Sequence, residues 1–153
     1  MPTAYAYKFH QIRLGESVIL RPILTVDLTG PTRKLSTVML VDSGADVSMI
    51  QLELAEQLGL SLTKVERTSG ISDSLPVYRT RVQAEIRYRQ QLLPSLDLPV
   101  QVPTEHGRPP FAMLGREVFF HQYDIAFRMG YTPTKGKFIL TPVAHRREPS
   151  RYR

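Results

Sequence analysis

The chain contains 153 residues, of which 42% are hydrophobic, so it can bury the core of one domain but not of two. It has no cysteine, which excludes disulfide bonds and thiolate chemistry. Its formal net charge of +6 raises the question of a nucleic-acid partner. Half of that excess lies in residues 145–153, with four arginines against one glutamate, and the other arginines are mostly dispersed. We therefore do not expect a nucleic-acid function.

The two ends of the chain differ in character from its middle. The N-terminal residues 1–8 lack the apolar core of a secretory signal, and no stretch approaches the roughly 20 apolar residues that span a bilayer. We expect a soluble, cytoplasmic protein without a membrane partner. We also expect residues 1–12 to form an N-terminal arm that can be flexible and residues 13–143 to form one folded domain. Residues 144–153 are expected to form a basic, disordered tail.

Prolines and glycines divide the chain into short strand-like runs, which is typical of an all-β barrel or sandwich. An apolar run at 17–20 is interrupted by Pro22 and resumes at 23–28. A turn at 30–34 then leads into a further apolar run at 35–41. The sequence therefore predicts a strand, a hairpin and a second strand before the first polar motif.

That motif is Asp42-Ser43-Gly44, which places a carboxylate at the end of an apolar strand. An aspartate there is partly buried and needs hydrogen bonds. Ser43 supplies a hydroxyl beside it, and Gly44 lets backbone amides approach the carboxylate without a side chain in the way. This arrangement suits a catalytic acid or base. The alternative is a simple Asx turn, in which Asp42 only accepts hydrogen bonds from neighbouring amides.

The next segments predict a helix and two more strands. Residues 48–60 combine helical apolar spacing with early glutamates and a glycine near the end, which predicts a short helix. Polar and apolar residues alternate from 77 to 89, which predicts a half-exposed strand. Its row of arginines is most simply a solvent-facing surface, and a partner surface is the alternative. The segment 92–103 is apolar but contains three prolines, which favours an edge strand.

A second motif, Met113-Leu114-Gly115-Arg116, ends another apolar run and precedes a short helical pattern at 118–120. The pairing of Asp42-Ser43-Gly44-Ala45 with this distant motif resembles the retropepsins, the single-domain aspartic proteases of retroviruses and their cellular and bacterial relatives. The resemblance runs from about Arg21 to Val143, and the segments at 55–60 and 119–127 are similar to the stand-alone bacterial members. It implies a closed, mostly antiparallel barrel with one or two short helices.

Aspartic proteolysis needs two carboxylates, and Asp-Ser-Gly occurs only once in this chain. The resemblance therefore implies a homodimer with its active site on a two-fold axis, built from two copies of Asp42. Two carboxylates so close together share one proton, and no metal, cofactor or covalent intermediate is required. In the family, the residue at the position of Ser43 hydrogen-bonds across the dimer. Asp42, Ser43 and Gly44 are the implied catalytic turn.

The family encloses its polypeptide substrate with a β-hairpin flap located between the two motifs. The best candidate here is the small-residue segment 68–74, where the amides of Gly70 and Ile71 would reach substrate carbonyls. An ordinary polar hairpin is the alternative. The residues that the resemblance places at the substrate are Ala45, Asp46, Val47, Ser69, Gly70, Ile71 and Met113.

Asp46 and Arg116 match the two positions that form an ion pair near the active site in retropepsins. If that pair is partly buried, its loss leaves an unpaired charge and costs several kcal/mol. The alternative is two unrelated surface charges.

The sequence thus favours a homodimeric aspartic endopeptidase that cleaves extended polypeptides. A rival from another class is a catalytically idle domain of the same fold that serves as a dimerisation or peptide-binding module. The aspartate and the following glycine, which idle relatives tend to lose, are both intact here. A weaker rival is a basic barrel associated with nucleic acid, whose binding would weaken steeply with salt.

Overall fold

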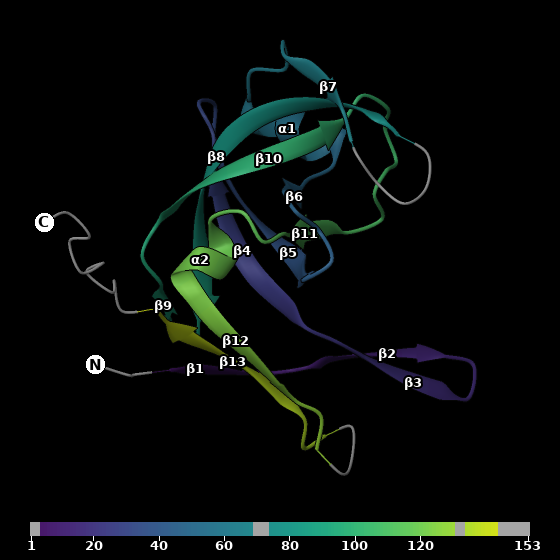
Figure 1. The fold of residues 1–153 in the computed structure, drawn as a ribbon, viewed down its shortest axis with the longest axis vertical. Coiled ribbons are helices and arrows are strands. Elements are labelled where there is room, and N and C mark those ends of the chain that lie inside the picture. Colours follow the sequence, from purple (N-terminus) through teal and green to yellow (C-terminus); the bar gives the residue numbers. More distant parts are fainter. Residues whose placement is uncertain (1–3, 69–73, 131–133, 144–153) are drawn as a thin grey trace, which may run out of the picture.

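The computed structural model describes residues 4–68, 74–130 and 134–143 (Figure 1). Its centre is a closed barrel in which each of six strands pairs with two others. In ring order these are β10 (Leu96–Pro103), β6 (Ser48–Met49), β11 (Ala112–Leu114), β5 (Lys34–Val41), β4 (Ile23–Thr29) and β8 (Pro76–Tyr88). Only the β10–β6 and β11–β5 pairings are parallel. The predicted closed, mostly antiparallel barrel is confirmed.

Strand β8 closes the ring because it is long enough to pair with β4 along one part and with β10 along most of its length. Its side chains alternate as the sequence predicts. Val82, Ala84 and Ile86 point inward and are buried, while Arg81 and Arg87 point outward and are exposed. This alternation builds one side of the barrel core.

The rest of the core comes from β4, β5, β10 and the helix α1 (Leu52–Leu58). The helix covers the barrel with Leu52, Ala55 and Leu58, all of which are buried. It ends at Gly59, which adopts a left-handed conformation with φ 73° and donates its amide to the carbonyl of Glu56. A second short helix, α2 (Phe119–Gln122), follows the second motif. One or two short helices were expected, and the described structure has two.

Two sequence predictions are wrong in detail. The helix expected from residue 48 begins at Leu52, because Ser48 and Met49 form β6, which pairs with β10 and β11. Strand β10 is not an edge strand, since it pairs with both β8 and β6. Its internal proline, Pro99, is tolerated because β6 pairs only at Val100 and Gln101, so Pro99 lies outside that pairing.

Smaller elements surround the barrel. Strands β1 (Tyr5–Lys8), β13 (Lys137–Pro142) and β12 (Tyr123–Arg128) form a three-stranded sheet in that order. The remaining strands are β2 (His10–Leu14) and β3 (Ser17–Arg21), which pair with each other, and β7 (Val65–Arg67) and β9 (Gln91–Leu92), which pair with β8. The segment expected to form an N-terminal arm therefore contains β1 and the start of β2, while the basic tail lies outside the described residues. No described helix is both long and apolar enough to cross a membrane.

One ion pair on the outer face of the barrel ties β4 to β8. Asp27 is 3% exposed, and its two carboxylate oxygens accept hydrogen bonds from Nε and Nη2 of Arg87, both at 2.8 Å. The hydroxyl of Ser36 also donates to this carboxylate, and Lys34 lies 3.6 Å away. The hydrogen bond from Arg87 holds the pKa of Asp27 below its ordinary value.

We expect Asp27→Asn to lower the free energy of unfolding at pH 7 by about 1–3 kcal/mol, because a charge-assisted pair is lost. The folded-state pKa of Asp27 is lowered, so its stabilising effect is full above the unfolded-state pKa and disappears as pH falls through the folded-state value. Urea unfolding at pH 7 and at progressively lower pH measures the difference, which should narrow below the ordinary carboxyl pKa of 3.8. If the two proteins differed in unfolding free energy by the same amount at every pH, the loss of stability would come from packing and not from the charge of Asp27.

Candidate active site

Asp42 lies where β5 leaves the barrel, and backbone hydrogen bonds fix the strand on both sides of that point. The amide of Val41 donates to the carbonyl of Pro22 at 2.8 Å. The amide of Asp42 donates to the carbonyl of Leu114 at 3.0 Å. Val41 and Leu114 are buried, whereas Asp42 is only partly buried. The carboxylate is thus anchored by a rigid backbone and remains accessible.

The turn after Asp42 orients its carboxylate. The amide of Gly44 donates to Oδ1 of Asp42 at 2.9 Å, and the amide of Ala45 donates to the Asp42 carbonyl at 3.3 Å. A Cβ at Gly44 would lie 3.2 Å from Oδ1, so a side chain there would crowd the carboxylate. Within the described residues, Oδ2 accepts no hydrogen bond. The Asx turn considered from the sequence is present, and it leaves one carboxylate oxygen open.

The second motif lies directly against the first. Strand β11 runs between β5 and β6, with Leu114 opposite Val41. The amide of Arg116 donates to the carbonyl of Ala45 at 2.8 Å, and the amide of Glu117 donates to that of Asp46 at 2.9 Å. The two motifs therefore form one continuous hydrogen-bonded unit.

The backbone at Gly115 lies close to the segment that follows Asp42. A Cβ at this position would lie 2.6 Å from the carbonyl carbon of Val47 and 2.9 Å from the carbonyl oxygen of Ala45. The Gly115 amide donates to Oγ of Ser48, which is fully buried, at 3.0 Å. Sequence reasoning missed Ser48 because it placed this residue in a helix. A serine within the apolar run after the first motif was the available signal.

The sequence comparison agrees with this arrangement. A family model described as aspartyl protease matches residues 24–118, which is more than half of the chain and includes both motifs. The chain belongs to the aspartyl protease family. No curated protein matches its sequence significantly. The matched region of this aspartyl protease begins in β4 and ends just before α2, so β1, β2, β3, β12 and β13 lie outside it.

The remaining residues predicted for the site of this aspartyl protease differ in exposure. Ser43 is exposed, and Ala45, Val47 and Met113 are partly buried. Ser69, Gly70 and Ile71, proposed as a flap, lie outside the described residues. The residues that flank this segment are hydrogen-bonded, since the Thr68 amide donates to the Leu75 carbonyl and the Leu75 amide to Thr68 Oγ1, each at 3.0 Å.

Asp46 and Arg116 are in contact, with Nη2 of Arg116 donating to Oδ1 of Asp46. Their side chains are 70% and 55% exposed in the single chain. The partial burial considered from the sequence is therefore not observed, and an ion pair so exposed contributes at most about 1 kcal/mol to the stability of the isolated chain.

The loop before β11 is hydrogen-bonded to helix α1. The Gly107 amide donates to Oε1 of Glu53 at 2.7 Å, and Nε2 of His106 lies 3.1 Å from Oε2 of Glu56. The hydrogen bond to Glu56 raises the pKa of His106. Among the described residues, no three histidine, aspartate or glutamate side chains are grouped so as to hold a metal ion.

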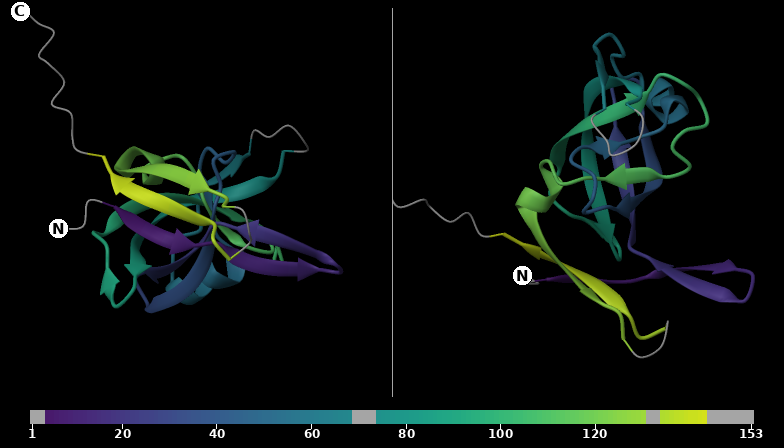
Figure 2. Two further views of the ribbon diagram at one scale, coloured as in Figure 1. Left: turned by 90° about the horizontal axis from the view of Figure 1, so that it is seen from below. Right: turned by 45° about the vertical axis from the view of Figure 1, so that its right-hand side comes forward.

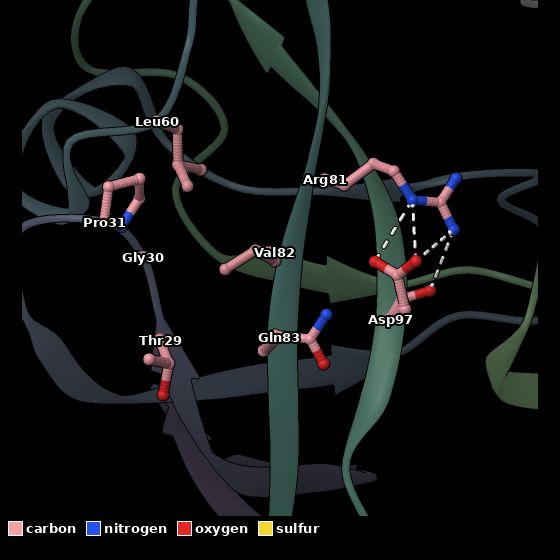
Figure 3. Close-up of a pocket in the computed structure, with 8 residues that line it drawn as sticks. All are labelled: Thr29, Gly30, Pro31, Leu60, Arg81, Val82, Gln83 and Asp97. Carbon is pink, nitrogen blue, oxygen red and sulfur yellow. Dashed lines mark hydrogen bonds and ion pairs between the residues drawn. The ribbon is translucent and has the colours of Figure 1, made fainter.

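A cavity of about 310 Å³ on the barrel wall is separate from the two motifs (Figure 3). Its lining includes Leu60, Val82 and the ion pair of Arg81 with Asp97, whose shortest hydrogen bond is 3.0 Å. The hydrogen bond to Asp97 raises the pKa of Arg81. Both charged groups are more than half exposed, so we assign this pair no catalytic role.

Proposed function

We propose that this aspartyl protease is an endopeptidase that acts as a homodimer, with one Asp42 from each chain at its active site. The observation that carries the proposal is the single Asp-Ser-Gly turn, whose aspartate is anchored through Oδ1 and keeps Oδ2 open. One carboxylate cannot supply both the base and the acid for peptide hydrolysis, and a two-fold axis supplies the second.

In the proposed reaction, the two carboxylates share one proton, because two adjacent negative charges repel each other. The ionised Asp42 removes a proton from water, which attacks the peptide carbonyl carbon. The protonated Asp42 of the other chain donates its proton to the carbonyl oxygen. The resulting gem-diol collapses when a proton reaches the leaving nitrogen, and the C–N bond breaks. Ser43 of each chain hydrogen-bonds across the dimer and keeps the two carboxylates nearly coplanar.

The proposed substrate is a polypeptide in extended conformation. In the proposed dimer, Ala45, Val47 and Met113 contact the substrate beside Asp42, and the amides of Gly70 and Ile71 hold its backbone. The apolar side chains favour apolar residues on both sides of the scissile bond. A peptide-library profile that prefers charged residues at the cleaved bond would contradict this specificity.

Mixing the wild-type chain with Asp42→Asn tests whether two copies of Asp42 act together. If dimers form at random and both aspartates are needed, activity per wild-type chain falls as the variant is added. At an equal ratio, about a quarter of the dimers contain two intact aspartates. Cleavage of an unstructured protein is measured at fixed wild-type concentration after subunit exchange. As a control, Asp97→Asn, which changes an exposed carboxylate on the barrel wall, should leave the activity unchanged.

Two outcomes would oppose the proposal. Activity per wild-type chain that stays constant as Asp42→Asn is added would mean that each chain works alone. A wild-type dimer that cleaves no unstructured substrate from acidic to neutral pH would favour the idle dimerisation or peptide-binding module.

A further inference from the structure

Strands β2 and β3 form a hairpin that stands apart from the barrel. We call this hairpin the arm (His10–Arg21), and it is distinct from the N-terminal arm expected over residues 1–12. In the described structure the two strands pair only with each other, and Figures 1 and 2 show them extending away from the barrel. None of the side chains in the two strands is fully buried. An isolated two-stranded hairpin is at best marginally stable in water. The arm is therefore an element that needs a packing partner.

The two faces of the arm differ. Leu20 points to one face and packs against the core of its own chain. Ile12 and Ile19 lie opposite each other on the other face, and Leu14 follows two residues after Ile12 on that face. Leu14 is 58% exposed, and neither isoleucine packs against the core. We call Ile12, Leu14 and Ile19 the outer face of the arm. These three apolar side chains share their side of the hairpin with His10, Ser17 and Arg21, and they have no packing partner in the core of their own chain.

The base of the arm lies next to the catalytic turn. β3 ends at Arg21, and the following residue, Pro22, accepts the hydrogen bond from the Val41 amide at 2.8 Å. Val41 immediately precedes Asp42 in the chain. In the proposed dimer, a second copy that brings its own Asp42 to this one would approach the base of the arm. The position of the arm next to this turn therefore favours the partner chain as the occupant of its outer face.

We propose that the outer face of each arm packs on the partner chain. Because the homodimer has a two-fold axis, both arms make the same contact. This inference rests on the dimeric active site proposed above. It goes beyond the family match, because the arm precedes the matched residues 24–118. The arm would strengthen the dimer without touching the substrate.

Leu14→Asp tests the arm, because it places a charge on the outer face at a position that is exposed in the single chain. Sedimentation velocity over a concentration series should show the dimer dissociation constant rise at least about tenfold, since each dimer buries two copies of Leu14. The matched control is Leu92→Asp, another exposed leucine in a short strand, β9, and Figure 1 shows β9 on the other side of the molecule from the arm. It should leave the dissociation constant unchanged.

A second measurement reports contact at the arm directly. The chain has no cysteine, so Leu14→Cys creates a unique site for alkylation. Its alkylation rate should fall as the protein concentration rises through the dissociation constant, whereas the rate at Leu92→Cys should not. Equal dissociation constants for Leu14→Asp and wild type would overturn the proposal, as would a Leu14→Asp variant that loses thermal stability without any change in dimerisation. The latter result would mean that the outer face packs on its own chain.

The catalytic proposal and the arm proposal fail in different ways. If the arm is wrong but the active site is right, wild type is a dimer, Asp42→Asn is inactive, and Leu14→Asp dimerises normally. If wild type cleaves substrate while remaining monomeric, the dimeric active site is wrong and the arm proposal falls with it. If both are right, Leu14→Asp regains wild-type cleavage at concentrations far above its own dissociation constant.

Discussion

Replacing Asp42 by asparagine should abolish peptide hydrolysis while leaving the barrel intact. Asparagine has nearly the same shape and keeps an oxygen that can accept the hydrogen bond from the Gly44 amide, so the turn is preserved. It can neither take a proton from water nor release one to the substrate. We expect cleavage of an unstructured protein to fall at least about 10³-fold across acidic to neutral pH.

The matched control is Asp97→Asn, which makes the same chemical change at an exposed carboxylate on the barrel wall. It should retain full activity, and all three proteins should have similar circular dichroism and sedimentation. Substantial cleavage by Asp42→Asn would refute the proposed mechanism, because no other residue is assigned as the acid or the base.

Gly115→Ala should have the largest effect on stability of any single methyl addition at the site. The added Cβ would lie 2.6 Å from a backbone carbon of Val47, and neither backbone can move without breaking the bonds between the two motifs. We expect the free energy of unfolding to fall by about 3 kcal/mol, with loss of cleavage, because the turn at Asp42 is displaced. Urea unfolding and a cleavage assay measure the two effects.

Gly107→Ala separates steric crowding from backbone strain. Gly107 has φ 79°, which disfavours alanine, but a Cβ there would meet nothing within 4 Å. This variant should lose only about 1 kcal/mol. If Gly115→Ala were no worse than Gly107→Ala, the close approach of the two motifs would not be a rigid constraint.

Local patterns were sufficient for the long strands of this aspartyl protease. The alternation along β8 predicted which side chains face the core, and Pro22 and Gly30 marked the ends of β4. Strand β6 could not be found in this way, because two residues carry no periodicity and the following helix dominates the pattern. Its existence depends on partners in β10 and β11 that are distant in the sequence.

The candidate site was predictable only in part for a similar reason. The motif residues were recognisable, and the structure brings Asp42, Asp46 and Arg116 into one hydrogen-bonded region. The exposure of the Asp46–Arg116 pair was not predictable, since residue types do not specify which surfaces the rest of the chain covers. The bond from the Gly115 amide to Ser48 required knowledge of how β11 and β6 pair.

The position of β11 between β5 and β6 also orders events during synthesis. Asp42 is held by Leu114, and its neighbours Ala45 and Asp46 are held by Arg116 and Glu117. These contacts are non-local, so they form only after the chain has been made beyond the second motif. A nascent chain that still lacks β11 contains Asp42 but not the backbone groups of the second motif that hold the turn at Asp42 in place. The hydrogen bonds that hold the turn at Asp42 therefore form only after the second motif has been synthesised.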